Sequence, residues 1–173
     1  MALVPPIDAS PEEVRAALAP LRSRASVALF AAENAFAVGA VIRVAHSFLL
    51  REVVIVGTEP HYAKASMGME KFEEVVRVPD EEALLAHVGA RPLWAVEKDH
   101  ATTSLYEIER FPDDVVLLFG SERAGIPRSL VARAEKVIGI PIYGVNHSLP
   151  LAVAAGIVMS EHARRRFVPG AVL

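Results

Sequence analysis

The sequence predicts an α/β domain in which a mostly parallel sheet is covered by helices on both faces. Short apolar runs alternate with segments of helical periodicity, as expected where strands and helices take turns along a chain. The run Val115–Phe119 is continuous and apolar, which is typical of a strand at the buried centre of a parallel sheet. With 173 residues, 53% of them hydrophobic, residues 1–173 are interpreted as a single domain with a sizeable core.

The N-terminal residues 1–22 are expected to form a short helical extension of this domain. Ser10 can cap a helix, Pro11 suits the first helical position, and Glu13 completes a capping box. The helix is expected to end near Ala19, where a proline follows.

Three strands and two helices are expected in the first half of the remaining chain. The strands are Val27–Ala31, Glu52–Gly57 and Val75–Val78, and the helices are Phe36–Phe48 and Glu81–His87. The longer helix is assigned because its apolar residues recur on one face, and the shorter one because Asp80 can cap it. Residues 60–73 are ambiguous and leave room for a short helix and a loop.

The second half continues the alternation. The strands are Pro92–Val96, Val115–Phe119 and Lys136–Ile140, and the helices are Pro127–Ala134 and Leu149–Phe167. Residues 98–110 are interpreted as a mixed connection. Helical connections between successive strands favour parallel pairing, because parallel strands need a long crossover.

Composition excludes several kinds of site. The chain has no cysteine, which excludes disulfides, thiolate zinc sites and cysteine nucleophiles and suits a reducing compartment. No His, Asp and Glu cluster shows ligand spacing, so no metal is expected. No signal peptide and no apolar run of about 18 residues is found, so a cytoplasmic protein without a membrane span is expected. The net charge of −3 argues against a protein coated in basic residues, although a local basic face remains possible.

Two loops late in the chain follow predicted strands, where open parallel sheets bind their ligands. In Gly120–Gly125 the glycines let the backbone approach a ligand, and Glu122 places a carboxylate at the strand end. Ile140–Leu149 mixes rigid, flexible and polar residues and leads into a helix that begins with small side chains. Each loop could also be an ordinary connector. The uncharged stretch Ser148–Ser160 fits a deeply buried helix or a homodimer interface.

Three segments together resemble the three motifs of the SpoU (TrmH-like) branch of the SPOUT RNA methyltransferases. Asn34–Phe48 resembles N-x-G-A-x-x-R-x-A-x-x-F, and Leu117–Gly125 resembles L-x-x-G-x-E-x-x-G. Ile140–Gly156 resembles I-P-x-x-G-x-x-x-S-L and the alanine-rich helix that follows it. The segments occur in the family's order and spacing, and the resemblance covers nearly the whole chain after about residue 22.

The resemblance implies a C-terminal trefoil knot that binds S-adenosylmethionine, and an obligate homodimer whose active site uses both subunits. It implies an S-adenosylmethionine-dependent RNA ribose 2′-O-methyltransferase. The acceptor is expected to be RNA because only RNA carries the 2′-hydroxyl. We favour transfer RNA as the substrate, with ribosomal RNA as the alternative.

The resemblance also assigns roles to individual residues. The implied catalytic residues are Arg43, Glu122 and Ser148. The residues implied to bind the cofactor are Phe119, Gly120, Ile140, Gly144, Ser148 and Leu149. The residues expected to contact RNA are Asn34, Arg43 and Arg123.

We interpret Arg43 as a group that binds phosphate and orients the ribose, because a guanidinium is a poor base at neutral pH. Glu122 is expected to hold the geometry of the site or a group of the partner chain, and Ser148 to orient Arg43 or the ribose. His46 and His147 are alternative bases, since imidazole titrates near neutral pH.

Two positions depart from the family pattern and keep other readings open. Ala37 and Pro150 stand where the family carries active-site asparagines. A non-catalytic RNA-binding protein of the same fold is therefore one alternative. An unrelated α/β enzyme of small-molecule metabolism is another, although the chain lacks both G-x-G-x-x-G after its first strand and a Walker sequence.

Overall fold

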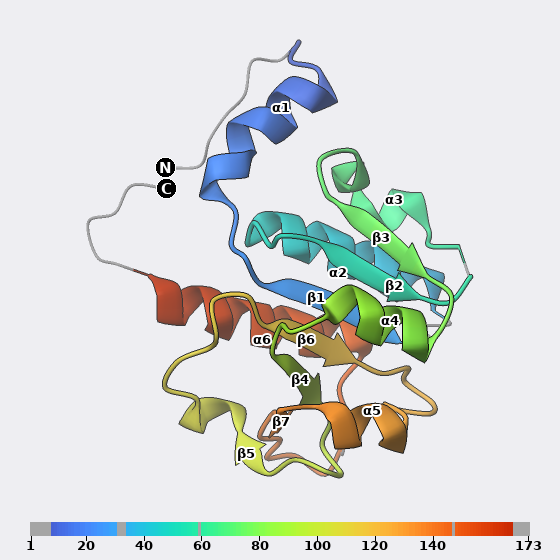
Figure 1. The fold of residues 1–173 in the computed structure, drawn as a ribbon, viewed down its shortest axis with the longest axis vertical. Coiled ribbons are helices and arrows are strands. Elements are labelled where there is room, and N and C mark those ends of the chain that lie inside the picture. The colour runs from blue at the N-terminus through green and yellow to red at the C-terminus, as the bar shows by residue number, and fades with distance from the viewer. Residues whose placement is uncertain (1–7, 31–33, 59, 147, 168–173) are drawn as a thin grey trace.

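The computed structural model describes residues 8–30, 34–58, 60–146 and 148–167. Seven strands lie in this part of the chain: β1 Ser26–Phe30, β2 Val53–Val56, β3 Val75–Val78, β4 Leu93–Val96, β5 Thr103–Ser104, β6 Val116–Phe119 and β7 Lys136–Gly139. They form one sheet in the order β3-β2-β1-β6-β4-β7-β5, and all neighbouring strands in it are parallel (Figure 1). The predicted parallel sheet is confirmed.

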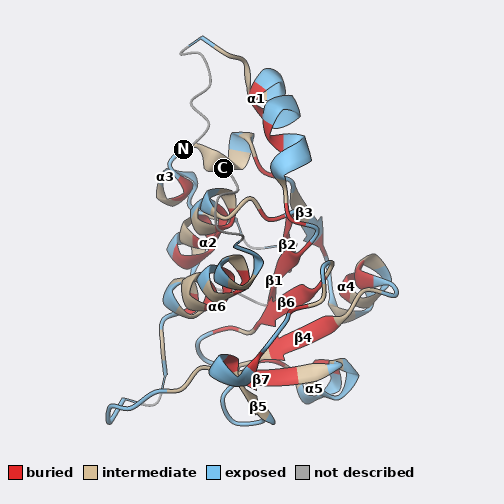
Figure 2. Cartoon of the chain, turned by 90° about the vertical axis from the view of Figure 1, so that its left-hand side faces the viewer, coloured by how far each residue is buried: buried red, intermediate tan, exposed pale blue. Residues whose placement is uncertain are grey.

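Six α-helices lie in the described residues: α1 Pro11–Leu18, α2 Ala35–Ser47, α3 Ala63–Ser66, α4 Glu81–Val88, α5 Arg128–Arg133 and α6 Leu151–Arg166. The described residues also contain three 3₁₀ turns: η1 Ala19–Leu21, η2 Met69–Lys71 and η3 Leu105–Glu107. Helices α2 and α6 cover one face of the sheet, and α4 and α5 cover the other (Figure 2). The prediction of helices on both faces is therefore confirmed.

The alternation of side chains along β1 explains this layering. Val27 and Leu29 point to one face and join the core formed with α2 and α6, whereas Ala28 joins the core under α4 and α5. All three side chains are fully buried. A central strand buried on both faces accounts for the continuous apolar runs in the sequence.

The N-terminal helix α1 begins with the predicted capping box. The backbone N–H of Glu13 donates to Ser10 Oγ at 3.2 Å, and the N–H of Ser10 donates to the Glu13 carboxylate at 2.8 Å. Arg22 then connects this N-terminal segment to the rest of the domain, because its guanidinium pairs with the buried Glu73 carboxylate at 2.7 Å. The same guanidinium donates to the carbonyl of Leu50 at 2.7 Å.

The structure differs from the sequence prediction at several boundaries. Helix α6 begins at Leu151 rather than Leu149, since Pro150 occupies the N-cap with extended ψ of 142°. The last core strand ends at Gly139, one residue before the predicted end. Residues 98–110, predicted as a mixed connection, contain the two-residue edge strand β5. No helix in the described residues is long and apolar enough to span a bilayer.

Candidate active site

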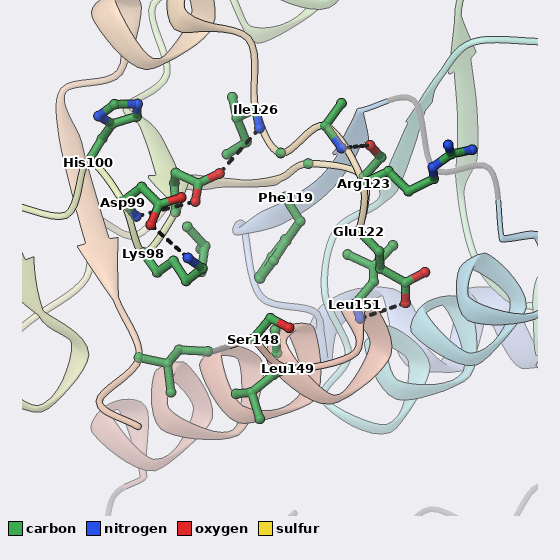
Figure 3. A pocket seen from close by; sticks show the side chains of 18 of the residues that line it. Lys98, Asp99, His100, Phe119, Glu122, Arg123, Ile126, Ser148, Leu149 and Leu151 are labelled. Atoms are coloured by element: carbon green, nitrogen blue, oxygen red, sulfur yellow. Dashed lines mark hydrogen bonds and ion pairs between the residues drawn. The ribbon is translucent and has the colours of Figure 1, made fainter. Parts of the chain in front are cut away.

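A cavity of about 500 Å³ opens at the carboxyl ends of β4, β6 and β7. Three segments line it: the residues after β4, the loop after β6, and the loop between β7 and α6. Seven predicted site residues are among its lining residues: Phe119, Gly120, Glu122, Arg123, Ile140, Ser148 and Leu149. Figure 3 shows Phe119 between the Lys98–Asp99 wall and the Glu122 wall, with Ser148 and Leu149 on the α6 side. The structure thus brings the two late loops together, as the motifs predicted.

The loop after β6 closes on itself through a backbone hydrogen bond. Ser121 and Gly125 form an antiparallel bridge, in which the N–H of Gly125 donates to the carbonyl of Ser121 at 2.9 Å. A Cβ at Gly120 would lie 2.1 Å from the carbonyl carbon of Gly125, so only glycine fits there. Gly125 itself has φ of 67°, the left-handed region that favours glycine. Both glycines of the motif are therefore required by local geometry.

Glu122 connects the two late loops. Its Oε1 accepts the backbone N–H of Leu151, the first residue of α6, at 3.1 Å. Pro150 at the N-cap gives no side-chain cap of its own, so a carboxylate from another loop supplies one. The negative charge also lies at the positive end of the α6 dipole. Glu122 consequently holds the two walls of the cavity in a fixed relation.

Glu97 is a site residue that the sequence analysis missed. It follows β4 and lines the cavity, and its Oε2 accepts the backbone N–H of Ile126 at 3.3 Å. A Cβ at Gly125 would lie 2.7 Å from the same oxygen, so the carboxylate packs against the loop after β6. A carboxylate directly after an apolar strand, at the edge where ligands bind, is the signal that could have found it.

The loop between β7 and α6 is only partly in the cavity. Ser148 and Leu149 line it, and the side chain of Asn146 closes a short turn by donating to the carbonyl of Ser148 at 2.9 Å. Tyr143 and Val145 are 88% and 95% exposed. Figure 2 shows this exposed segment extending away from the body before α6 begins. Gly144 lies in that segment and does not line the cavity, although it was predicted to bind the cofactor.

Two of the predicted RNA-contacting residues lie at the N-cap of α2 and on the helix itself. Asn34 caps the helix, its Oδ1 accepting the N–H groups of Phe36 and Ala37 at 3.1 and 3.2 Å. Arg43 is exposed on the solvent side of α2 and does not line the cavity of its own chain. The third, Arg123, lines the cavity, but its side chain points away from the Lys98–Asp99 wall (Figure 3).

The structure places only one of the two histidines considered as alternative bases. His46 Nδ1 lies 2.7 Å from the buried carboxylate of Glu73, and His46 does not line the cavity. His147 lies outside the described residues. Within the described ranges, no three His, Asp or Glu side chains are grouped as a metal site would require.

Comparison with known proteins identifies the family. Residues 24–160 match the SpoU rRNA Methylase family. The chain belongs to this family. Among curated SpoU relatives, it is 30% identical over 137 residues to the 23S rRNA (guanosine-2′-O-)-methyltransferase RlmB of Coxiella burnetii. It is also 30% identical over 122 residues to YacO of Bacillus subtilis, a putative TrmH family tRNA/rRNA methyltransferase.

These two matches cover 76% and 70% of this chain but only 54% and 49% of the relatives. The chain therefore spans about half the length of the curated SpoU proteins that it matches.

Solved structures of SpoU proteins share the fold. The A. aeolicus TrmH/SpoU tRNA modifying enzyme superposes with a TM-score of 0.79 at 22% identity, covering 90% of this chain and 82% of that one. An AdoMet-bound rRNA methyltransferase from Sinorhizobium meliloti superposes with a TM-score of 0.74 at 30% identity. The match covers 83% of this chain and 57% of that one. A structure that concerns the 2-OH methylation of C/U34 on tRNA superposes with a TM-score of 0.75 at 25% identity. The match covers 82% of this chain and 95% of that one.

Proposed function

We propose that this SpoU protein is an S-adenosylmethionine-dependent RNA ribose 2′-O-methyltransferase that works in the cytoplasm. The observation that carries the proposal is the cavity between the two late loops, which family motifs two and three line together. The names of its relatives support the reaction, since RlmB is a guanosine-2′-O-methyltransferase. The AdoMet-bound structure at 30% identity supports the cofactor.

The cavity fits an adenosyl group. Its volume of about 500 Å³ lies within the usual range for cofactor sites. Apolar side chains of Phe119, Ile140 and Leu149 would contact a flat base, and the half-buried backbone of Gly120 lines the cavity beside them. These residues would hold the cofactor, which supplies an electrophilic methyl group when bound.

The chain's own residues would supply the remaining requirements of the reaction. Glu122 keeps the wall formed by α6 in register with the loop after β6. Such positioning can lower a barrier by about 7–11 kcal/mol when two reacting groups are aligned. Ser148 lines the cavity and is exposed, so its hydroxyl is available to a ribose or to an arginine.

Arg43 would reach the reaction from the partner subunit. It is exposed and lies outside the cavity of its own chain, which supports a site shared between two copies. We therefore propose a homodimer in which Arg43 binds a phosphate and orients the 2′-oxygen through its planar fork of donors. A C-terminal trefoil knot in a single domain of residues 1–173 completes the proposed architecture. The proposal requires no metal.

Transfer RNA is the substrate that we favour. The solved structure that concerns 2-OH methylation of C/U34 on tRNA is covered over 95% of its length. The 23S rRNA methyltransferase RlmB of Coxiella burnetii is covered over only 54% of its length. Ribosomal RNA stays the alternative.

The test combines methyl transfer with nucleoside analysis. The purified protein is incubated with methyl-labelled S-adenosylmethionine and, separately, with tRNA and rRNA from cells lacking the protein. We expect label in tRNA and a 2′-O-methylated nucleoside by mass spectrometry. RNA binding without cofactor binding would support the non-catalytic alternative, made plausible by Ala37 and Pro150. Binding of free nucleotides without RNA affinity would support a small-molecule enzyme.

An Arg43→Lys variant tests the role of the arginine in the same assay. Lysine keeps the charge but loses the bidentate fork, so we expect methyl transfer to fall at least tenfold with little change in cofactor affinity. Unchanged transfer in the lysine variant would rule out the fork.

A further inference from the structure

An exposed pair of aromatic rings lies beside the start of α2. Phe36 and Tyr62 stack with their ring centroids 6.3 Å apart and their planes inclined by 27°. Phe36 is 62% exposed and Tyr62 is 46% exposed, so neither ring belongs to the core. Neither residue is among the catalytic, cofactor-binding or RNA-contacting residues that the family resemblance implies. Two neighbouring exposed rings on one surface call for an explanation by function.

The backbone holds the pair rigidly. The N–H of Tyr62 donates to the carbonyl of Ala35 at 2.9 Å, which ties the segment before α3 to the first residue of α2. A Cβ at Gly39 would lie 2.6 Å from the carbonyl oxygen of Tyr62. This close contact therefore depends on glycine, which lets α2 and the Tyr62 segment approach closely enough for the rings to stack.

The pair lies at the same edge of the sheet as the cavity. β1 and β6 are parallel neighbours, with Leu29 opposite Phe119. The chain leaves the carboxyl end of β1 toward Phe36 and leaves that of β6 toward Gly120, so both features lie at the edge where parallel strands end (Figure 1). We therefore expect an RNA bound along this edge of the sheet to pass the rings.

Arg43 extends this surface along α2. It follows Phe36 by seven residues, so the two side chains share a helix face about 10 Å apart along the axis. Its guanidinium has no hydrogen bond or ion pair with another described residue. A cation and two flat rings on one surface match a nucleic-acid strand, which offers phosphates and π-faces together.

We propose that Phe36 and Tyr62 form a platform on which a base of single-stranded RNA stacks. The inference rests on the proposed function, because it assumes that RNA is the substrate of this chain. Stacking on aromatic side chains tolerates any base, so the platform would hold an unpaired nucleotide flanking the modified one without reading its identity. It favours a loop or a bulge over a continuous duplex.

The experiment measures binding of a short fluorescein-labelled single-stranded RNA by anisotropy. Phe36→Ala and Tyr62→Ala are each expected to weaken binding about tenfold, the usual cost of losing one stacking contact. Phe36→Trp is expected to bind like the wild type, and Phe36→Leu like the alanine variant, because leucine keeps apolar area but no ring. Tyr106→Ala is the matched control, since Tyr106 is 55% exposed in η3, which follows the edge strand β5 far from β1 and β2 in the sheet order.

A second probe separates stacking from charge. The same oligonucleotide with abasic riboses keeps its phosphates, so we expect it to bind weakly and to be insensitive to Phe36→Ala. Alanine variants that bind the intact RNA as tightly as the wild type would overturn the proposal, as would full binding by Phe36→Leu. Weakened self-association of the alanine variants in sedimentation, with RNA affinity retained, would show that the rings contact a second copy instead.

Two readouts distinguish this inference from the proposed function. Affinity for S-adenosylmethionine, measured by calorimetry, is expected to be the same in Phe36→Ala and the wild type. If the wild type methylates RNA and the ring variants bind and methylate as it does, only the platform is wrong. If the wild type transfers no methyl group to RNA, the proposed function is wrong, whatever the rings do.

Discussion

His162 on α6 is an unusual buried residue. It is 1% exposed, and neither ring nitrogen has a hydrogen-bond partner among the described residues. Its ring packs edge-on against Phe111 with centroids 5.3 Å apart. Burial lowers the pKa of His162 to about 4, and the charge of Arg166 lowers it too, while Asp113 opposes them. The side chain is therefore neutral in the folded protein at neutral pH.

This histidine predicts a loss of stability in acid. The unfolded chain binds the proton near the ordinary pKa of about 6.5 and the folded chain only near 4, so stability falls as pH drops between these values. From about pH 8 to about pH 5 the loss is expected to be about 2 kcal/mol. His162→Met should remove this contribution, as measured by urea unfolding at both pH values. An equal pH dependence in wild type and variant would contradict it, and His100→Gln, at an exposed position, is the control.

The hydrogen bond between Glu122 and the start of α6 is expected to stabilise the fold. Glu122→Ala removes the acceptor for the N–H of Leu151 and is expected to lower the free energy of unfolding by about 1 kcal/mol, as loss of a helix cap does. Glu122→Gln keeps a carbonyl acceptor and should retain most of that stability. Urea denaturation near neutral pH measures both. Equal stability of the alanine variant and the wild type would mean that the bond contributes nothing.

At the scale of elements, periodicity predicted most of the strands and helices but not their ends. Helix α6 starts later than expected because Pro150, which lacks an N–H, takes the cap position instead of the helix interior. The strand β5 was missed because two residues, Thr103 and Ser104, are too short to show any alternation. Such an edge strand exists only through its pairing with β7, which is a tertiary contact.

The candidate site was predictable to the extent that motifs lie in local loops. The two late loops were indicated by their glycines and by their positions after strands, whereas Ser148 and Leu149, which line the cavity, were assigned by the family resemblance. Glu97 was missed, since its role depends on Ile126, which is distant in sequence. The relation of Arg43 to the cavity involves surfaces of two chains under the proposed dimer, and no local pattern within one chain can specify it.

The loop after β6 gives a prediction about one element. Gly120→Ala places a methyl group 2.1 Å from the backbone of Gly125, so the loop after β6 must change its conformation. We expect the free energy of unfolding to fall by about 1–3 kcal/mol, as in other overpacked sites, and cofactor binding to weaken more than tenfold. Calorimetry and thermal denaturation measure the two effects.

Gly144→Ala is the matched control for the fold, since among the described residues no atom beyond its chain neighbours lies within 4 Å of a Cβ at that position. Its stability is expected to stay within about 0.5 kcal/mol of the wild type. Wild-type stability and cofactor affinity in Gly120→Ala would show that the loop tolerates a side chain, which would contradict the tight packing between Gly120 and Gly125.

At the scale of the whole molecule, the proposed shared site predicts complementation between inactive variants. Arg43→Ala and Ser148→Ala would each be inactive alone, because every site in either homodimer lacks one group. After mixing and exchange of subunits, half of the dimers would be mixed and would hold one intact site each, giving about a quarter of wild-type activity. Methyl transfer by the mixture measures this. No recovery, with subunit exchange shown by mass spectrometry, would place both groups in one chain's site.

The position of β1 also has a consequence for biogenesis. β1 pairs with β2 on one side and with β6 on the other. At about 5–20 residues per second, β6 leaves the ribosome several seconds after β1. During that interval an N-terminal intermediate would present β1 as an open, apolar edge, able to pair with a neighbouring nascent chain. Production of this protein should therefore depend on holdase chaperones that shield such edges until translation is complete.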